Sequence, residues 1–191
     1  MAVMRQHRAL FVLVVFACML SMASCGGSTP ATPAGGARGA TVHAAQPARA
    51  APSATAKMIC AHETQTELAG VLGVRTTQPV VPAWTGHRYS CRYTYRNGVM
   101  VLSVKELSSQ AETDAYFTSL AHRLGQTGRP QAIDRGAFFT TRNHSVVVRK
   151  DDKVLLVNIS GLPARFGAPP STRADVAIKV AATIMDCWTG G

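Results

Sequence analysis

The stretch that decides the fold is residues 88–106, RYSCRYTYRNGVMVLSVKE. Its first half alternates between two faces of an extended chain. One face carries Tyr89, Cys91, Tyr93 and Tyr95. Asn97 and Gly98 follow, and Asn-Gly between two strand-forming runs is the strongest local signal for a β-hairpin. Residues 99–106 supply the second strand, so the sequence predicts an antiparallel hairpin here.

A helix is predicted on each side of this hairpin. Before it, TQTE at 64–67 has the spacing of a capping box, and Gly73 follows as a stop signal. After it, SQAE at 109–112 forms a second capping box, and the helix that it opens ends at Gly125. The proline-containing segment 76–86 and the Gly-Arg-Pro break at 128–130 are predicted as irregular chain.

The rest of the chain predicts three strands and a last helix. The strands are 136–142, 145–150 and 153–160, joined by an Asn-His turn and an Asp-Asp turn. The helix covers 172–187. Its apolar face carries Val176, Ala177, Val180, Ala181, Ile184 and Trp188.

These elements follow one another in the order α-β-β-α-β-β-β-α, with links short enough for hairpins. Such an order predicts an α+β fold, in which an antiparallel sheet of about five strands has helices packed on one face.

The N-terminus has the features of an export signal. Arg5 and Arg8 precede the apolar run 9–20, which is shorter than the roughly 20 residues of a membrane-spanning helix. MASCGG at 22–27 then resembles a bacterial lipobox, with Met22 in place of the usual Leu. We expect residues 1–24 to be a lipoprotein signal peptide and Cys25 to carry the lipid, which anchors the protein on the outer face of the cytoplasmic membrane. The alternative is ordinary cleavage and free secretion.

Two further segments are expected after the signal. Residues 25–57 consist mainly of Gly, Ser, Thr, Pro and Ala, and we expect a disordered tether because little here can pack. Residues 58–191 are expected to form one extracytoplasmic domain, whose length suits a single core.

Charge narrows the class of partner. The chain has 20 Lys and Arg against 10 Asp and Glu, and from Met58 onward the ratio is 15 to 10. This excess is moderate, without the basic stripe and interleaved aromatics of a nucleic-acid binder. We therefore expect membrane lipid, reached through Cys25, and an envelope protein or polymer as partners, and no nucleic acid.

The cysteines leave two pairings open. Once Cys18 is removed with the signal and Cys25 is lipidated, Cys60, Cys91 and Cys187 remain in an oxidising compartment. A bridge from Cys60 to Cys91 would close a loop of about 30 residues. A bridge from Cys60 to Cys187 is the rival, since it would join the first and last helices.

Several of these sequence features, taken together, resemble those of a known group of proteins. They are Cys60 ahead of a helix that ends at Leu72 and Gly73, the strand segment CRY at 91–93, and DRGAFF at 134–139 before two Val-rich strands. Together they resemble small secreted and lipid-anchored proteins of unknown function common in actinobacteria. The resemblance covers most of residues 58–188 and implies an extracytoplasmic lipoprotein domain with a Cys60–Cys91 bridge. His62, Glu63 and the additional Cys187 depart from it.

Motifs for catalysis, metal binding or phosphate loops do not occur in the sequence, so we expect no cofactor, no metal site and no enzyme. Tyr89, Tyr93 and Tyr95 either form part of the core or line a ligand groove. The leading hypothesis is a lipid-anchored, non-enzymatic domain with a binding or assembly role in the cell envelope. One alternative is a ligand or signal sensor that works with a membrane partner. Another is a hydrolase or thiol enzyme, which would need Cys187 or a serine together with His and carboxylate groups in one cleft.

Overall fold

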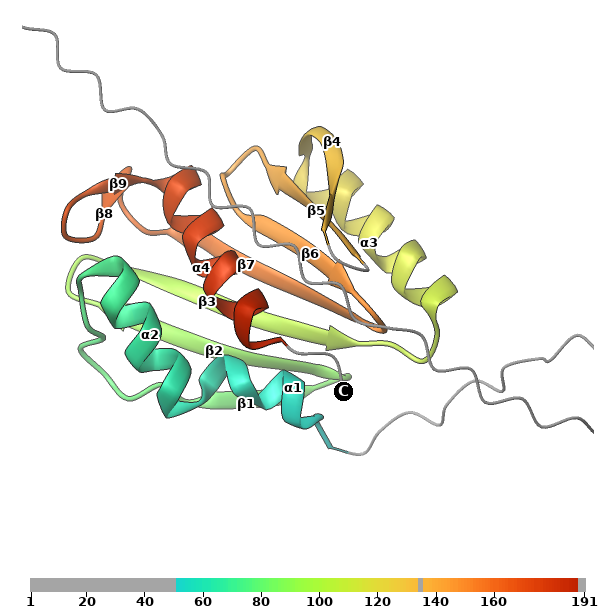
Figure 1. Ribbon diagram of the computed structural model, residues 1–191, viewed down its shortest axis with the longest axis horizontal. Coiled ribbons are helices and arrows are strands. Elements are labelled where there is room, and N and C mark those ends of the chain that lie inside the picture. Colours follow the sequence, from blue (N-terminus) through green and yellow to red (C-terminus); the bar gives the residue numbers. More distant parts are fainter. Residues whose placement is uncertain (1–50, 134–135, 189–191) are drawn as a thin grey trace, which may run out of the picture. The chain divides into compact units, whose positions relative to one another are not determined.

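The computed structural model of the 191-residue chain describes residues 51–133 and 136–188 (Figure 1). The helices within these residues are α1 (Ala54–Lys57), the 3-10 helix η1 (Met58–Cys60), α2 (His62–Leu72), α3 (Gln110–Leu124) and α4 (Arg173–Cys187). The strands are β1 (Pro82–Thr85), β2 (Arg88–Tyr95), β3 (Gly98–Glu106), β4 (Gln126–Ile133), β5 (Gly136–Thr141), β6 (Val146–Lys150), β7 (Lys153–Gly161), β8 (Arg165–Phe166) and β9 (Ser171–Thr172).

The main sheet confirms the predicted α+β class. Its strands lie in the order β1-β2-β3-β7-β6-β5-β4, and every neighbouring pair is antiparallel. The predicted hairpin is β2–β3, with Tyr95 opposite Gly98 across the turn. A separate two-stranded sheet, β8–β9, precedes α4.

The sheet has seven strands, so the prediction of about five was too low. The two additional strands, β1 and β4, are its edges and fall in segments predicted as irregular. Each contains a proline, Pro82 in β1 and Pro130 in β4. A proline is excluded from the middle of a sheet because it has no N–H to donate, but an edge strand tolerates it on its outer side.

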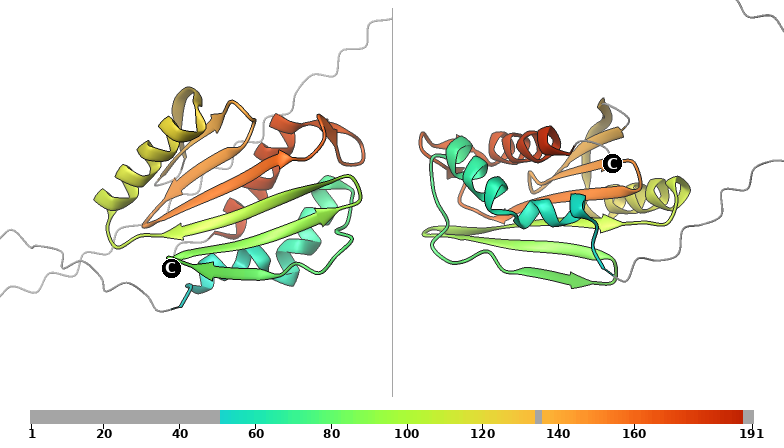
Figure 2. Two further views of the ribbon diagram at one scale, coloured as in Figure 1. Left: turned by 180° about the vertical axis from the view of Figure 1, so that it is seen from behind. Right: turned by 60° about the horizontal axis from the view of Figure 1, so that its bottom comes forward.

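Helices cover both faces of the sheet, whereas the sequence predicted one. In β6, Val146 and Val148 join the cluster that includes α2 and α4 side chains, while Val147 joins the cluster beneath α3. Neighbouring residues of a strand point to opposite faces, so α3 lies on the other side of the sheet from α4. The front and back views agree with this assignment (Figures 1 and 2).

The predicted helix caps are partly confirmed. Ser109 caps α3 by accepting a hydrogen bond from the Glu112 backbone N–H at 3.2 Å. The predicted capping box at Thr64 is wrong, because α2 begins at His62 with Ala61 as a cap that makes no side-chain bond. Thr64 lies inside the helix and is buried.

The domain begins before Met58. The last four residues of the predicted tether form α1, which Ser53 caps, and Ala56 is fully buried in the core. The predicted signal peptide, Cys25 and most of the tether lie outside the described residues. In the part of the chain that is described, none of the helices is both long and apolar enough to cross a membrane.

Candidate functional site

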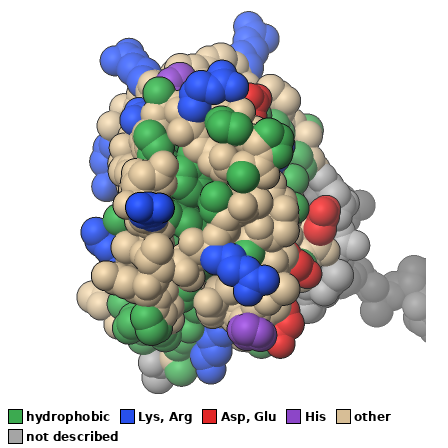
Figure 3. Space-filling model, turned by 90° about the vertical axis from the view of Figure 1, so that its left-hand side faces the viewer, with side chains coloured by type: hydrophobic (Ala, Val, Ile, Leu, Met, Phe, Trp, Pro, Cys, Tyr) green, Lys and Arg blue, Asp and Glu red, His purple; other side chains and the backbone are tan. Residues whose placement is uncertain are grey.

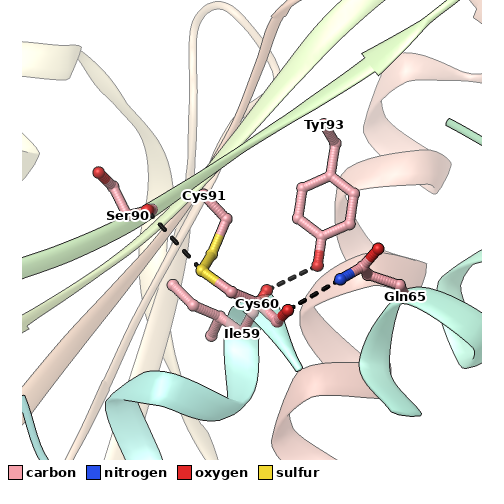
Figure 4. Close-up of a disulfide and its surroundings, with 6 residues drawn as sticks. All are labelled: Ile59, Cys60, Gln65, Ser90, Cys91 and Tyr93. Carbon is pink, nitrogen blue, oxygen red and sulfur yellow. Dashed lines mark hydrogen bonds between the residues drawn. A yellow bond between two sulfur atoms is a disulfide. The ribbon is translucent and has the colours of Figure 1, made fainter. Parts of the chain in front are cut away.

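A disulfide joins Cys60 in η1 to Cys91 in β2, with a Cα–Cα distance of 5.7 Å (Figure 4). Neighbouring hydrogen bonds fix the same junction: the Tyr93 hydroxyl donates to the Ile59 carbonyl at 2.6 Å, and Gln65 Nε2 donates to the Cys60 carbonyl at 2.9 Å. The structure thus contains the first of the two pairings that the sequence left open, and Cys187 stays a free thiol.

The three tyrosines do not form a ligand groove. Tyr93 and Tyr95 are 1% and 6% exposed, and the Tyr95 ring packs edge-on against Phe166 at a centroid distance of 4.9 Å. Burial raises the pKa of the Tyr93 hydroxyl, which therefore remains a hydrogen-bond donor. Tyr89 is partly buried and packs at the margin of the same core. The strand face that they share is therefore part of the core, which is the first of the two interpretations that the sequence allowed.

A groove instead lies between α4 and the outer strands on the same side of the sheet. We call it the α4 groove; its volume is about 630 Å³. Its strand wall includes Ile133, Phe138, Val146 and Val148, and its helix wall includes Ile178, Ala181, Ala182, Met185 and Trp188. Because α4 packs against β6 and β7, it leaves the adjoining face of β4 and β5 uncovered.

Two charged residues also line the α4 groove. Lys150 is 9% exposed, and its ammonium donates to the Trp188 carbonyl at 3.1 Å, which ties the end of α4 to the sheet. Asp186 is exposed. The lining contains no histidine, serine or cysteine, and therefore no imidazole base and no hydroxyl or thiol nucleophile.

Cys187 lies outside this groove and is only partly buried. Its thiol donates to Glu67 Oε2 at 3.2 Å, and this bond, with burial and the charges of Glu67 and Asp186, raises the pKa of Cys187. A raised pKa leaves less thiolate at neutral pH, which is the opposite of what a catalytic cysteine needs. No group of three or more potential metal ligands occurs among residues 51–133 and 136–188.

Positive charge is spread over one face of the domain. Figure 3 shows Lys and Arg side chains spread over one end of it, with the Asp and Glu side chains of that view mostly along one side.

Comparison with protein-family models, curated proteins and solved structures found no match for this chain. The resemblance to actinobacterial lipoproteins therefore stays a prediction.

Proposed function

We propose that this protein is a lipid-anchored, non-enzymatic domain on the outer face of the cytoplasmic membrane, and that it binds the acyl chain of a lipid in the α4 groove. The observation that carries this proposal is the groove itself. Its volume of about 630 Å³ lies within the range of roughly 300–1,000 Å³ that is usual for small-molecule sites.

The chemistry of the lining supports an acyl chain as the ligand. Nine of the eleven lining residues are apolar. Ile178 remains 47% exposed at the groove, although large aliphatic side chains usually avoid water. A bound acyl chain would remove this surface from water, at about 0.8 kcal/mol for each methylene that is buried.

One further observation supports the cellular setting. A disulfide between Cys60 and Cys91 is typical of an oxidising, extracytoplasmic compartment. An anchor at Cys25 would also hold the domain beside a bilayer, which is the richest source of acyl chains. The groove lining lacks the side chains of nucleophilic or acid–base catalysis apart from Lys150 and Asp186, which fits binding without turnover.

The anchor is tested first. The wild-type chain, expressed in a bacterium that processes lipoproteins, is expected to enter the detergent phase on Triton X-114 partition because a diacylated Cys25 is strongly apolar. The Cys25→Ala chain is expected in the aqueous phase. A mature wild-type chain that mass spectrometry shows without added lipid would contradict the anchor.

The groove is tested by titration of a fluorescent long-chain fatty acid with the Cys25→Ala chain. Ala182 is exposed and lines the groove, so Ala182→Trp should fill it without disturbing the core. We expect this change to weaken binding by about tenfold or more, the equivalent of losing roughly two buried methylenes.

The matched control is Val71→Trp on α2, where the side chain is 46% exposed and lies outside the groove. It should bind like the parent chain. The proposal fails if the parent shows no saturable binding, or if Ala182→Trp and Val71→Trp bind equally well.

A further inference from the structure

A second pocket lies on the opposite face of the sheet. Seen from behind, α3 lies on the side of the sheet formed by β5, β6 and β7 (Figure 2, left), and its Tyr116 reaches Arg88 at the start of β2. Where α3 meets the start of β2 and the end of β3, the structure forms a pocket of about 240 Å³, which we call the anion pocket. Its base is aliphatic, and its polar lining consists of Arg88, Ser103, Lys105, Tyr116 and Arg123.

Three cations meet in this pocket from three different elements. Arg88 in β2 lies directly opposite Lys105 in β3, and Arg123 comes from α3. None of the three forms an ion pair with a carboxylate in residues 51–133 or 136–188. Like charges placed together repel one another, so an anion that joins them is favoured.

Tyr116 positions both arginines. The Arg88 Nη2 group donates to the Tyr116 hydroxyl at 3.3 Å, and the Arg123 guanidinium carbon lies 5.9 Å from the centroid of the Tyr116 ring. The Lys105 ammonium donates to the Gly86 carbonyl at 2.6 Å. These contacts hold the cations near the pocket while most of their N–H groups remain available to a ligand.

Two hydroxyl groups add further donors. Ser103 is 9% exposed, and its side chain lines the pocket. The Tyr116 hydroxyl uses its oxygen to accept from Arg88, so its own hydrogen can be donated. The pocket therefore presents charged and neutral donors with no carboxylate in its lining.

The carboxylate that interacts with these cations, Glu112, already forms hydrogen bonds with Ser108. The Glu112 carboxylate accepts hydrogen bonds from the Ser108 backbone N–H at 2.9 Å and the Ser108 hydroxyl at 2.5 Å. These bonds lower the pKa of Glu112, and the charges of Lys105 and His87 lower it further. Glu112 thus stays ionised but outside the lining of the pocket.

We infer that the anion pocket binds a phosphate group. Arginine forks match phosphate oxygens in paired hydrogen bonds, and three cations suit a group with more than one negative charge better than a single carboxylate. A volume of about 240 Å³ is below the usual range for a whole small-molecule ligand, so the pocket takes the phosphate and leaves the attached group outside. This phosphate belongs either to a soluble phosphomonoester or to a lipid headgroup.

The test uses the full chain with Cys25→Ala, so that no attached lipid contributes to binding. Glycerol 3-phosphate is titrated by calorimetry, and vesicles of phosphatidylcholine with or without phosphatidic acid are tested by co-sedimentation. The double variant Arg88→Gln/Arg123→Gln is expected to bind at least tenfold more weakly than the parent to whichever phosphate source binds, since it loses two charged donors.

The control is Arg75→Gln/Arg96→Gln, which removes the same charge from exposed positions outside the pocket. It should keep at least half of the parent's affinity. Binding of glycerol 3-phosphate that only the pocket variant loses supports a soluble ligand, and the same pattern with phosphatidic acid alone supports a headgroup. Equal losses in both variants, or no binding to either source, would overturn the inference. The fatty-acid probe of the α4 groove carries no phosphate, and that groove lies on the opposite face of the sheet from Arg88 and Arg123. Acyl chains of the vesicles can enter the groove in every variant, so only the difference between the two double variants is assigned to the phosphate.

Discussion

Removal of the disulfide by Cys60→Ala together with Cys91→Ala is expected to lower the free energy of unfolding by about 3–4 kcal/mol. The bridge spans a sequence separation of 31 residues, and opening it increases the conformational entropy of the unfolded chain. A domain of this size is usually stable by only about 5–15 kcal/mol, so the loss is a large fraction of the total. Urea unfolding followed by circular dichroism measures it.

Two controls distinguish the effect of losing the disulfide from the effect of replacing cysteine side chains. Reduction of the wild-type protein should produce a loss of similar size, whereas Cys187→Ala should change the stability little, because its bond to Glu67 is exposed. A double variant within about 1 kcal/mol of wild type, or peptide mapping that links Cys60 to Cys187, would contradict the structure.

The Gly73→Ala substitution is expected to lower the free energy of unfolding by about 3 kcal/mol or more. Gly73 ends α2 with φ of 65°, a left-handed conformation that costs an alanine roughly 1–2 kcal/mol. A Cβ atom there would also lie 2.0 Å from the Ala168 carbonyl oxygen, so the backbone would have to move. The hydrogen bond from the Ala168 N–H to the Leu72 carbonyl, 2.8 Å long, would be disturbed with it.

Gly70 provides the matched control three residues earlier. It lies inside α2, and nothing is within 4 Å of the position that a Cβ would take. Gly70→Ala should therefore raise the free energy of unfolding by about 0.5–1 kcal/mol through helix propensity. Thermal and urea unfolding of both variants should shift in opposite directions. Equal shifts would show that the end of α2 does not contact the segment around Ala168 as described.

The elements that could be predicted from the sequence are those specified by a turn motif or by regular apolar spacing. Asn97 and Gly98 specified the central hairpin, and the apolar face of α4 could be read from its spacing because all six residues of that face are buried. The edge strands could not be read in this way. Their prolines are typical of irregular chain, and only the pairing of β1 with β2 and of β4 with β5 shows that they are strands.

The candidate sites were less predictable because they depend on where helices lie. Arg88 could be placed from the sequence on the polar face of its strand, and the hairpin register brings Lys105 opposite it. Arg123 joins them only because α3 crosses the other face of the sheet, and no local pattern specifies that choice. The α4 groove likewise exists because α4 packs on β6 and β7 and not on β5. The position of a helix across a sheet depends on tertiary packing, which the local sequence does not specify.

The prolines of the two edge strands hinder strand pairing between neighbouring copies of the protein. An edge strand exposes backbone groups that can pair with another sheet, and this leads to aggregation when molecules are crowded. Anchored proteins diffuse in two dimensions at high local concentration, so their edges meet often. Pro82 and Pro130 each remove a donor from an edge, β1 is only four residues long, and the register of β4 is interrupted between Thr127 and Gln131. The sheet thus ends in two borders on which another strand cannot form a full ladder, which disfavours edge-to-edge pairing of neighbouring copies.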